Sequence, residues 1–196
     1  VIAHEIKYHA FCWFPARFDR IELRKSAKLT DCISTAALPS NAFIISDRAL
    51  KVFQGFDQGK HVIYPATGPH KGSISEYHVL HFINEMEGQL DCAKSRFHVT
   101  DMMGKPKFSI GIMDQGELED KRKLVHEGAF PGTEKFDYVR LTFGYFGPSV
   151  RTPDIFTIMR AGTEPYISVG LADAIVEAGL TGFRINEALD LADPAE

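Results

Sequence analysis

Two segments of the chain show the same order of local signals: an apolar strand, a serine, an amphipathic helix, a glycine and a second strand. They run from Phe43 to Tyr64 and from Tyr166 to Ile185. Neither segment is long enough to bury its own apolar face. We therefore expect the two to pack against each other or against a central sheet. A structural duplication and a chance likeness between two short capped helices both explain the similarity.

The first segment begins with a short apolar strand at Ala42–Ile45. Ser46 follows at the position of a helix N-cap, where a serine side chain accepts a hydrogen bond from a backbone N–H. Gly55 ends the predicted helix. His61–Tyr64 has β character and stops at Pro65, which predicts a second strand.

The second segment repeats this order near the end of the chain. Tyr166-Ile167 predicts a short strand, and Ser168 stands at the next N-cap position. The helix that follows is expected to end at Gly179, because glycine tolerates the left-handed backbone of a helix terminus. Phe183–Ile185 then predicts a closing strand.

Between the two segments, strand-like runs alternate with turns. Ala66–Ser75 is rich in glycine, proline and serine and predicts a surface loop. The charged run Asp114–Lys123 fits either an exposed helix or a mobile loop. Further strands are predicted at Tyr77–Ile83, Phe97–Val99, Phe108–Met113, Tyr138–Phe146 and Ile155–Arg160. Together these elements predict one α+β domain over residues 1–196, with a mostly antiparallel sheet and two short helices.

The composition is typical of a globular protein in a reducing compartment. Hydrophobic residues make up 44% of the chain, and 15 phenylalanines supply bulk for a core. Cys12, Cys32 and Cys92 lie far apart without a C-x-x-C pair, which argues against a disulfide framework and a zinc ribbon. The longest apolar runs are too short to cross a bilayer, and no signal peptide is visible. We expect a cytoplasmic protein without membrane association.

The net charge of −4 is distributed unevenly along the chain. Residues 1–98 carry 12 Lys/Arg and 10 Asp/Glu, whereas residues 99–196 carry 10 and 16. An acidic second half does not favour nucleic acid, because phosphate binding needs clustered Lys and Arg. It suits either a basic protein partner or an ordinary solubilising surface. The candidate contact residues for a basic partner are Asp114, Glu117, Glu119 and Asp120.

Catalytic chemistry finds little support in the sequence. His78 and His81 are three apart on a predicted strand, so their side chains should lie on opposite faces and not share a metal ion. Cys92 has no local signature that places a base beside it. No G-x-S-x-G, H-E-x-x-H or G-x-G-x-x-G motif occurs. We expect no catalytic residue, no metal and no cofactor.

Five segments between about Leu38 and Asp190 form a recognisable pattern: Phe43–Arg48, Tyr77–Leu80, Gln89–Ser95, Tyr166–Ser168 and Ala178–Arg184. Their most specific pieces are Asp91-x-x-Lys94-Ser95 and Gly179-Leu180-Thr181-Gly182. In these segments the chain resembles immunity protein family 11, a family of bacterial immunity proteins.

The resemblance implies a non-catalytic protein of interbacterial competition. Such a protein is made beside a toxin gene, binds the toxin and covers its active site. The family has no catalytic motif to transfer, and the matching serines and glycines have structural explanations. Two other hypotheses remain: a hydrolase that uses Cys92 or the pair His78 and His81, and a general adaptor or scaffold protein.

Overall fold

The computed structural model describes residues 28–33, 41–70, 73–83, 86–158 and 165–187. The chain forms two compact units. Unit 1 comprises Val1–Asn84, Thr152–Thr157 and Glu164–Asn186, and unit 2 comprises Glu85–Arg151, Ile158–Thr163 and Glu187–Glu196. Helices mix with antiparallel sheets, which confirms the α+β class. A single domain over residues 1–196 stays a prediction.

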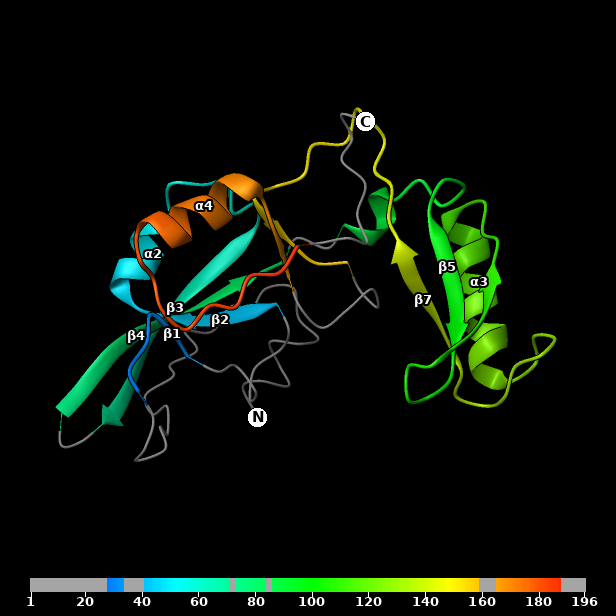
Figure 1. Ribbon diagram of the computed structural model, residues 1–196, viewed down its shortest axis with the longest axis horizontal. Helices are drawn as coiled ribbons and strands as arrows, with labels where there is room; N and C mark the ends of the chain where they lie inside the picture. The colour runs from blue at the N-terminus through cyan, green and yellow to red at the C-terminus, as the bar shows by residue number, and fades with distance from the viewer. Residues whose placement is uncertain (1–27, 34–40, 71–72, 84–85, 159–164, 188–196) are drawn as a thin grey trace. The chain divides into compact units, whose positions relative to one another are not determined.

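A four-stranded antiparallel sheet forms the centre of unit 1 (Figure 1). Its strands lie in the order β1 (Cys32–Ile33), β2 (Ala42–Ile45), β4 (Ser73–Phe82) and β3 (His61–His70). The predicted strand at Ala42–Ile45 is confirmed. Strands β3 and β4 pair from His61 opposite Phe82 to His70 opposite Ser73, so they form one long hairpin.

The predicted surface loop at Ala66–Ser75 is wrong, because both strands of this hairpin extend into it. Strand β3 does not stop at Pro65, which pairs with His78. Proline is tolerated at this place because β3 lies at the edge of the sheet. The N–H that proline lacks can therefore face away from the ladder.

Two capped helices cover one face of this sheet: α2 (Asp47–Phe53) and α4 (Val169–Glu177) (Figure 1). The Ser46 side chain accepts a hydrogen bond from the Ala49 N–H, and Ser168 accepts one from the Leu171 N–H. Both N-cap predictions are confirmed. The helices pack against each other and share a core with the sheet, made of Ile45, Ala49, Leu50, Phe53, Leu80, Phe82, Ile155, Leu171 and Ile175.

The similarity of the two capped segments does not extend to the strands on either side of the helix. Strand β9 (Tyr166–Ile167) pairs with β8 (Ile155–Phe156) in a separate two-stranded ribbon. The predicted closing strand at Phe183–Ile185 is wrong, since these residues form no strand. The Phe183 ring instead stacks on Phe53, with ring centroids 5.9 Å apart. Packing of this side chain into the helical core outweighs its β propensity.

His78 and His81 lie on opposite faces of β4, as predicted. The His78 imidazole contacts the Asp47 carboxylate at the start of α2. His81 is buried on the other face, where its Nε2 lies 3.2 Å from the Asn41 side-chain nitrogen. Burial lowers the pKa of His81 below its ordinary value.

Unit 2 is a three-stranded antiparallel sheet with one helix (Figure 1). The strands lie in the order β6 (Pro106–Ile110), β5 (Arg96–Thr100) and β7 (Tyr138–Phe143), and a 3-10 turn, η1, spans Glu87–Gln89. Helix α3 (Gln115–Glu127) packs against β7. The apolar side chains buried in this unit include Phe97, Val99, Ile110, Leu118, Val125, Val139 and Leu141.

The charged run Asp114–Lys123 is helical rather than a loop, so the described residues contain three α-helices instead of the predicted two. The Asp114 side chain caps α3 by accepting a hydrogen bond of 2.8 Å from the Glu117 N–H. Gly128, with φ of 71°, ends the helix. None of the helices described is long and apolar enough to cross a membrane.

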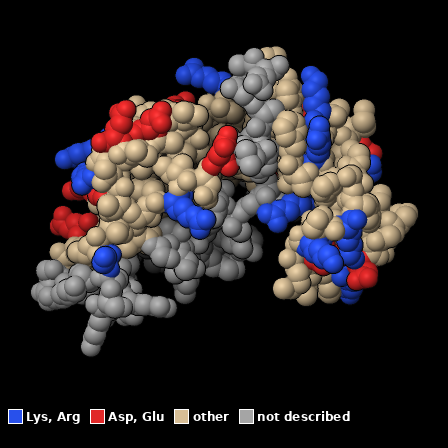
Figure 2. Space-filling model, in the orientation of Figure 1, with Lys and Arg blue, Asp and Glu red and all other residues tan. Residues whose placement is uncertain are grey.

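Acidic and basic side chains are mixed on the visible surface of each unit (Figure 2). The excess of acid in the second half of the chain does not come from α3. Residues 99–151 carry eight Lys/Arg and eight Asp/Glu, whereas residues 152–196 carry two and eight. The net charge of −6 therefore belongs to the last 45 residues of the sequence.

Candidate functional site

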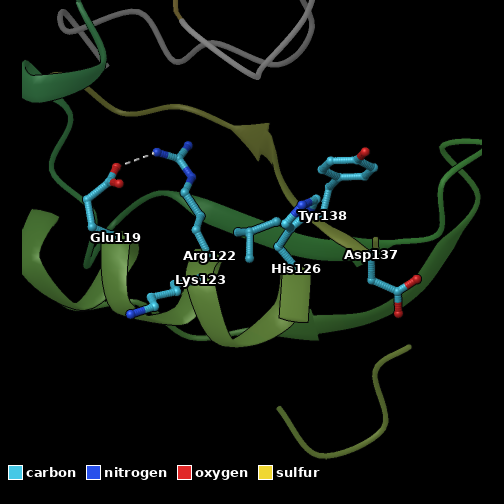
Figure 3. A pocket seen from close by; sticks show the side chains of 7 residues that line it. Glu119, Arg122, Lys123, His126, Asp137 and Tyr138 are labelled. Carbon is cyan, nitrogen blue, oxygen red and sulfur yellow. Dashed lines mark hydrogen bonds and ion pairs between the residues drawn. The ribbon is translucent and has the colours of Figure 1, made fainter. Parts of the chain in front are cut away.

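A partly open pocket of about 350 Å³ lies between α3 and the start of β7 in unit 2 (Figure 3). The α3 residues that line it are spaced three or four apart, so they share one face of the helix. Asp137, Tyr138 and Val139 form the opposite wall. The helix contributes Glu119, Arg122, Lys123 and His126.

Arg122 is held by carboxylates. Its side chain is 7% exposed and donates hydrogen bonds to Glu87 at 2.9 Å and to Glu119 at 3.0 Å. Burial alone would lower the pKa of this guanidinium, but the two carboxylates outweigh burial and hold the pKa above its ordinary value. Because its charge is balanced, Arg122 mainly ties η1 to α3. Its Nε atom has no hydrogen-bond partner.

Asp137 fixes the turn that leads into β7. Its buried carboxylate accepts hydrogen bonds of 2.8 Å from Lys107 Nζ and 2.8 Å from the Glu134 N–H. Burial would raise the pKa of this carboxyl, but these two donors lower it below its ordinary value. In Figure 3 the carboxylate is turned away from the other pocket residues. Asp137 therefore supports the pocket wall and does not offer a free acid to a ligand.

Phe136, in the same turn, adopts a backbone conformation that is rare for a bulky residue. Its φ is 71°, and it is the single non-glycine residue with positive φ in the described part of the chain. Such a conformation costs about 1–2 kcal/mol. The Phe136 N–H donates to the His126 carbonyl oxygen at 2.9 Å, while the side chain is 46% exposed. The turn thus holds an aromatic side chain at the surface under backbone strain.

Phe136, His126 and Tyr138 form an aromatic cluster beside the pocket. The ring centroid of His126 lies 5.5 Å from that of Phe136 and 5.4 Å from that of Tyr138. Tyr138 is 45% exposed, and Lys135 Nζ lies 5.3 Å from the centre of the Phe136 ring. Aromatic side chains are enriched at the centres of protein interfaces.

The structure brings only one of the four predicted contact residues to this pocket. Glu119 lines it, while Asp114 is occupied as the helix cap. Glu117 forms an ion pair of 2.7 Å with Lys121 and accepts a hydrogen bond from the Met113 N–H, and these contacts lower the pKa of its carboxyl. Asp120 is exposed on α3. The prediction that these four residues contact a partner has not been tested.

Sequence reasoning missed the aromatic cluster. One usable signal is present: Tyr138 alternates with the apolar Val139 and Leu141 along its predicted strand, and an aromatic residue on the polar face of a strand is a candidate contact. The conformation of Phe136 had no such signal. It depends on the close approach of the turn to Gly128, where an added Cβ would lie 2.8 Å from the Lys135 nitrogen.

The residues considered for catalysis lie apart from this pocket. The Cys92 thiol is buried in unit 2, and burial raises its pKa, so it stays protonated. His78 and His81 belong to unit 1. Cys12 lies outside the described residues. Within the described residues, no group of three or more His, Cys, Asp or Glu side chains is placed to hold a metal ion.

No protein family, curated protein or solved structure matches this chain in the three comparisons with known proteins. The likeness to immunity protein family 11 therefore rests on the quoted motifs alone.

Proposed function

We propose that this protein is an immunity protein that binds a cognate bacterial toxin through the aromatic cluster of unit 2 and neutralises it by covering the toxin's active site. The observation that carries the proposal is the strained backbone at Phe136. A fold retains such strain where the surroundings enforce it, and strained residues concentrate at binding and catalytic sites. Here the strained residue displays an aromatic ring rather than a catalytic group.

The composition of the cluster supports a protein partner. Binding energy at protein interfaces concentrates in a few desolvated aromatic and arginine side chains, surrounded by a polar rim. Phe136 and Tyr138 provide two half-exposed rings. Lys135 lies against the Phe136 ring, and Lys123 lines the same pocket as Tyr138.

The motif residues of the resemblance serve the fold, which leaves the contact surface to other residues. Ser46 and Ser168 cap helices. The Ser95 hydroxyl donates to the Asp91 carbonyl oxygen at 2.8 Å and accepts from the Tyr145 N–H at 3.0 Å. Immunity proteins that share a fold but bind different toxins need a contact surface outside such structural positions. The aromatic cluster lies outside the quoted segments.

The test is co-expression in bacteria with the product of the neighbouring reading frame. We expect wild-type protein to restore growth and the double variant Phe136→Asn/Tyr138→Thr to lose protection. Asn tolerates positive φ and Thr suits a strand, so both changes preserve the backbone. The matched control is Val176→Ala, which removes an exposed apolar side chain from α4 in unit 1. Persistent toxicity with wild-type protein would reject the proposed function.

The same experiment separates the rival hypotheses. An adaptor protein would bind without protecting cells from the neighbouring gene product. A hydrolase that uses Cys92 would lose its effect on Cys92→Ala, whereas an immunity protein would keep it.

A further inference from the structure

The loop Asp101–Lys105 lies at the same end of unit 2 as the aromatic cluster. It connects β5 to β6, and Thr100, the last residue of β5, pairs with Tyr138, the first residue of β7. This register places the loop beside the start of β7. Four side chains with large exposed apolar surfaces therefore share one end of a small sheet: Met102, Met103, Phe136 and Tyr138. We call this set the apolar end.

The loop is held in one conformation by its own hydrogen bonds. The Asp101 carboxylate accepts from the Met103 N–H at 2.9 Å and from the Lys105 N–H at 2.8 Å. The Gly104 N–H donates to the Asp101 carbonyl oxygen at 2.9 Å, and Gly104 adopts a φ of 83° that suits glycine. A preorganised loop loses little conformational freedom when it binds.

This loop directs two methionines into solvent. Met102 is 69% exposed and Met103 is 87% exposed. Their unbranched side chains adapt to irregular apolar surfaces, which is why methionine is frequent at protein-binding surfaces. Together with Phe136 and Tyr138 they form an apolar centre, and exposed apolar groups gathered in one place mark interaction sites.

Basic residues surround the apolar end. Lys105 and Lys135 are exposed, and a Cβ added at Gly104 would lie 3.6 Å from Arg140 Nη1, so this guanidinium lies against the loop. The two nearby carboxylates are already occupied: Asp101 holds the loop, and Asp137 pairs with Lys107 at 2.8 Å. Glu134 also lies near Lys107, at 3.7 Å, and its side chain is exposed. Figure 2 shows Lys and Arg side chains with some Asp and Glu on the visible face of this unit.

We infer that the apolar end contacts a protein surface that is apolar at its centre and acidic at its rim, with Met102 and Met103 inserted into that centre. The inference rests on the proposed function and identifies the chemistry of the toxin surface. It reverses the expectation of a basic partner. Two of the acidic residues behind that expectation, Asp114 and Glu117, lie at the start of α3, near the end of β6, and therefore at the opposite end of unit 2. A third, Glu119, is paired with Arg122.

A protein fits this surface better than nucleic acid or a membrane. Residues 85–151 carry ten Lys/Arg and eleven Asp/Glu, so unit 2 has no excess of positive charge to attract phosphates over a long range. Three basic residues around an apolar centre are fewer than the clusters typical of binding to anionic lipids. The same arrangement matches a protein interface with an apolar core and a complementary charged rim.

The experiment measures affinity between the purified protein and the neighbouring gene product over a range of salt concentrations. We expect Lys105→Glu/Arg140→Glu to weaken binding about tenfold or more at low salt, because both charges lie in the rim, and to flatten or reverse the salt dependence. Met102→Gln/Met103→Gln should weaken binding about tenfold with an unchanged salt dependence. Lys51→Glu, a charge reversal of the same kind at an exposed position of α2 in unit 1, is the matched control and should change affinity less than about threefold. Asp120→Lys tests whether the acidic residues of α3 contact the partner instead.

The outcomes separate this inference from the proposed function. If wild-type protein protects cells and both double variants bind as wild type does, the Met102–Met103 loop and its basic rim are not part of the contact. The inference is then wrong, while the proposed contact through Phe136 and Tyr138 stands. If Asp120→Lys weakens binding and Lys105→Glu/Arg140→Glu does not, the partner contacts the acidic residues of α3 instead, which also overturns the inference. Absence of binding by wild-type protein overturns both.

Two further measurements exclude alternative causes. Urea unfolding of each variant shows whether the fold is retained, and a variant that binds weakly but unfolds as wild type does supports the inference. Titration of wild-type protein with duplex DNA and with anionic phospholipid vesicles tests the other anionic partners. Binding to either that is lost in Lys105→Glu/Arg140→Glu, without binding to the neighbouring gene product, would assign the surface to that partner and overturn the inference.

Discussion

The guanidinium of Arg48 donates a hydrogen bond of 2.7 Å to the main-chain oxygen of Gly179, which lies 131 residues further along the chain. The same group reaches the carbonyl oxygen of Ala178. Close by, the Asp31 carboxylate accepts hydrogen bonds from the N–H and hydroxyl of Thr181 at 2.9 and 3.1 Å. These contacts fasten the end of α4 to the start of α2 and to the segment before β1.

We predict that Arg48→Met destabilises the protein by about 1 kcal/mol. The change keeps much of the aliphatic stem but removes a charged donor from two helix-terminal carbonyls, which lowers the free energy of unfolding. Because the contact is exposed to solvent, we expect a smaller loss of unfolding free energy than for a buried hydrogen bond to a charged group. Urea unfolding measures it. Arg184→Met, at an exposed position in the same segment, is the control and should shift the free energy of unfolding by less than about 0.5 kcal/mol.

Gly182→Ala should be more damaging. Gly182 has a φ of 88°, and a Cβ there would lie 2.0 Å from the Cys32 carbonyl oxygen, so the Thr181–Gly182 segment would have to move away from β1. We expect a loss of at least about 2 kcal/mol, or failure to fold.

Gly170→Ala is the matched glycine substitution in the same unit. It lies within α4, where an added Cβ meets Phe56 at an ordinary 3.5 Å. Since alanine favours helix, this variant should unfold at equal or higher urea concentration than wild type. Equal behaviour of Gly182→Ala and Gly170→Ala would show that the close approach to Cys32 is absent.

Backbone strain at Phe136 predicts an inverted ranking of two substitutions. At most positions a glycine variant is less stable than the alanine variant of the same protein. At a φ of 71°, however, glycine avoids the steric clash that alanine would have with the backbone. Phe136→Gly should therefore be more stable than Phe136→Ala by about 1 kcal/mol. Thermal unfolding of the pair measures the difference. Both variants lack the phenylalanine ring, so its effect on stability drops out of the difference between them. A more stable alanine variant would contradict the strained conformation.

His81 predicts a specific dependence of stability on pH. Burial lowers its pKa, so below pH of about 6.5 the unfolded chain takes up a proton at this histidine that the folded protein does not. Stability should fall as the pH drops from about 6.5 and stop falling below the pKa of the folded state. His81→Gln should remove this component between pH 7.5 and 5. The carboxyls of Asp31 and Asp137 have lowered pKa values, so they change the stability only in more acidic solution. Their contribution to the pH dependence should be the same in both proteins. Identical pH slopes in the two proteins would contradict burial of a neutral His81.

Local signals in the sequence predicted the helix starts accurately. Ser46, Ser168 and the glycine after α4 were assigned correctly because a cap depends on backbone groups three or four residues away. The strand predicted at Tyr138–Phe146 is also confirmed over Tyr138–Phe143, with Val139 and Leu141 buried. These features depend on the spacing of residues that lie close together in the chain, and this spacing can be read from the sequence.

The errors concern features that long-range contacts decide. Whether Pro65 ends a strand depends on that strand's position in the sheet, and only the edge position of β3 explains its continuation. Phe183 has strong β propensity, yet its environment is the ring of Phe53, 130 residues away. The contact residues were selected by charge, although Lys121 and Arg122 lie at helical spacing from Glu117 and Glu119 and neutralise them. These ion pairs between residues three or four apart could have been predicted from the sequence once a helix was assumed.

The arrangement of the two units in the chain sets an order for folding during synthesis. The strands and helix described in unit 2 lie in one continuous run between residues 85 and 151, whereas the core of unit 1 also needs Leu171, Ile175 and Phe183. At about 5–20 residues per second, the ribosome reaches residue 183 roughly two to six seconds after residue 151. The sheet and helix described in unit 2 can thus form first, while Phe53 and Leu80 stay exposed until α4 is made. A product truncated before α4 would carry this folded sheet and helix together with an exposed apolar surface, which favours aggregation or chaperone binding.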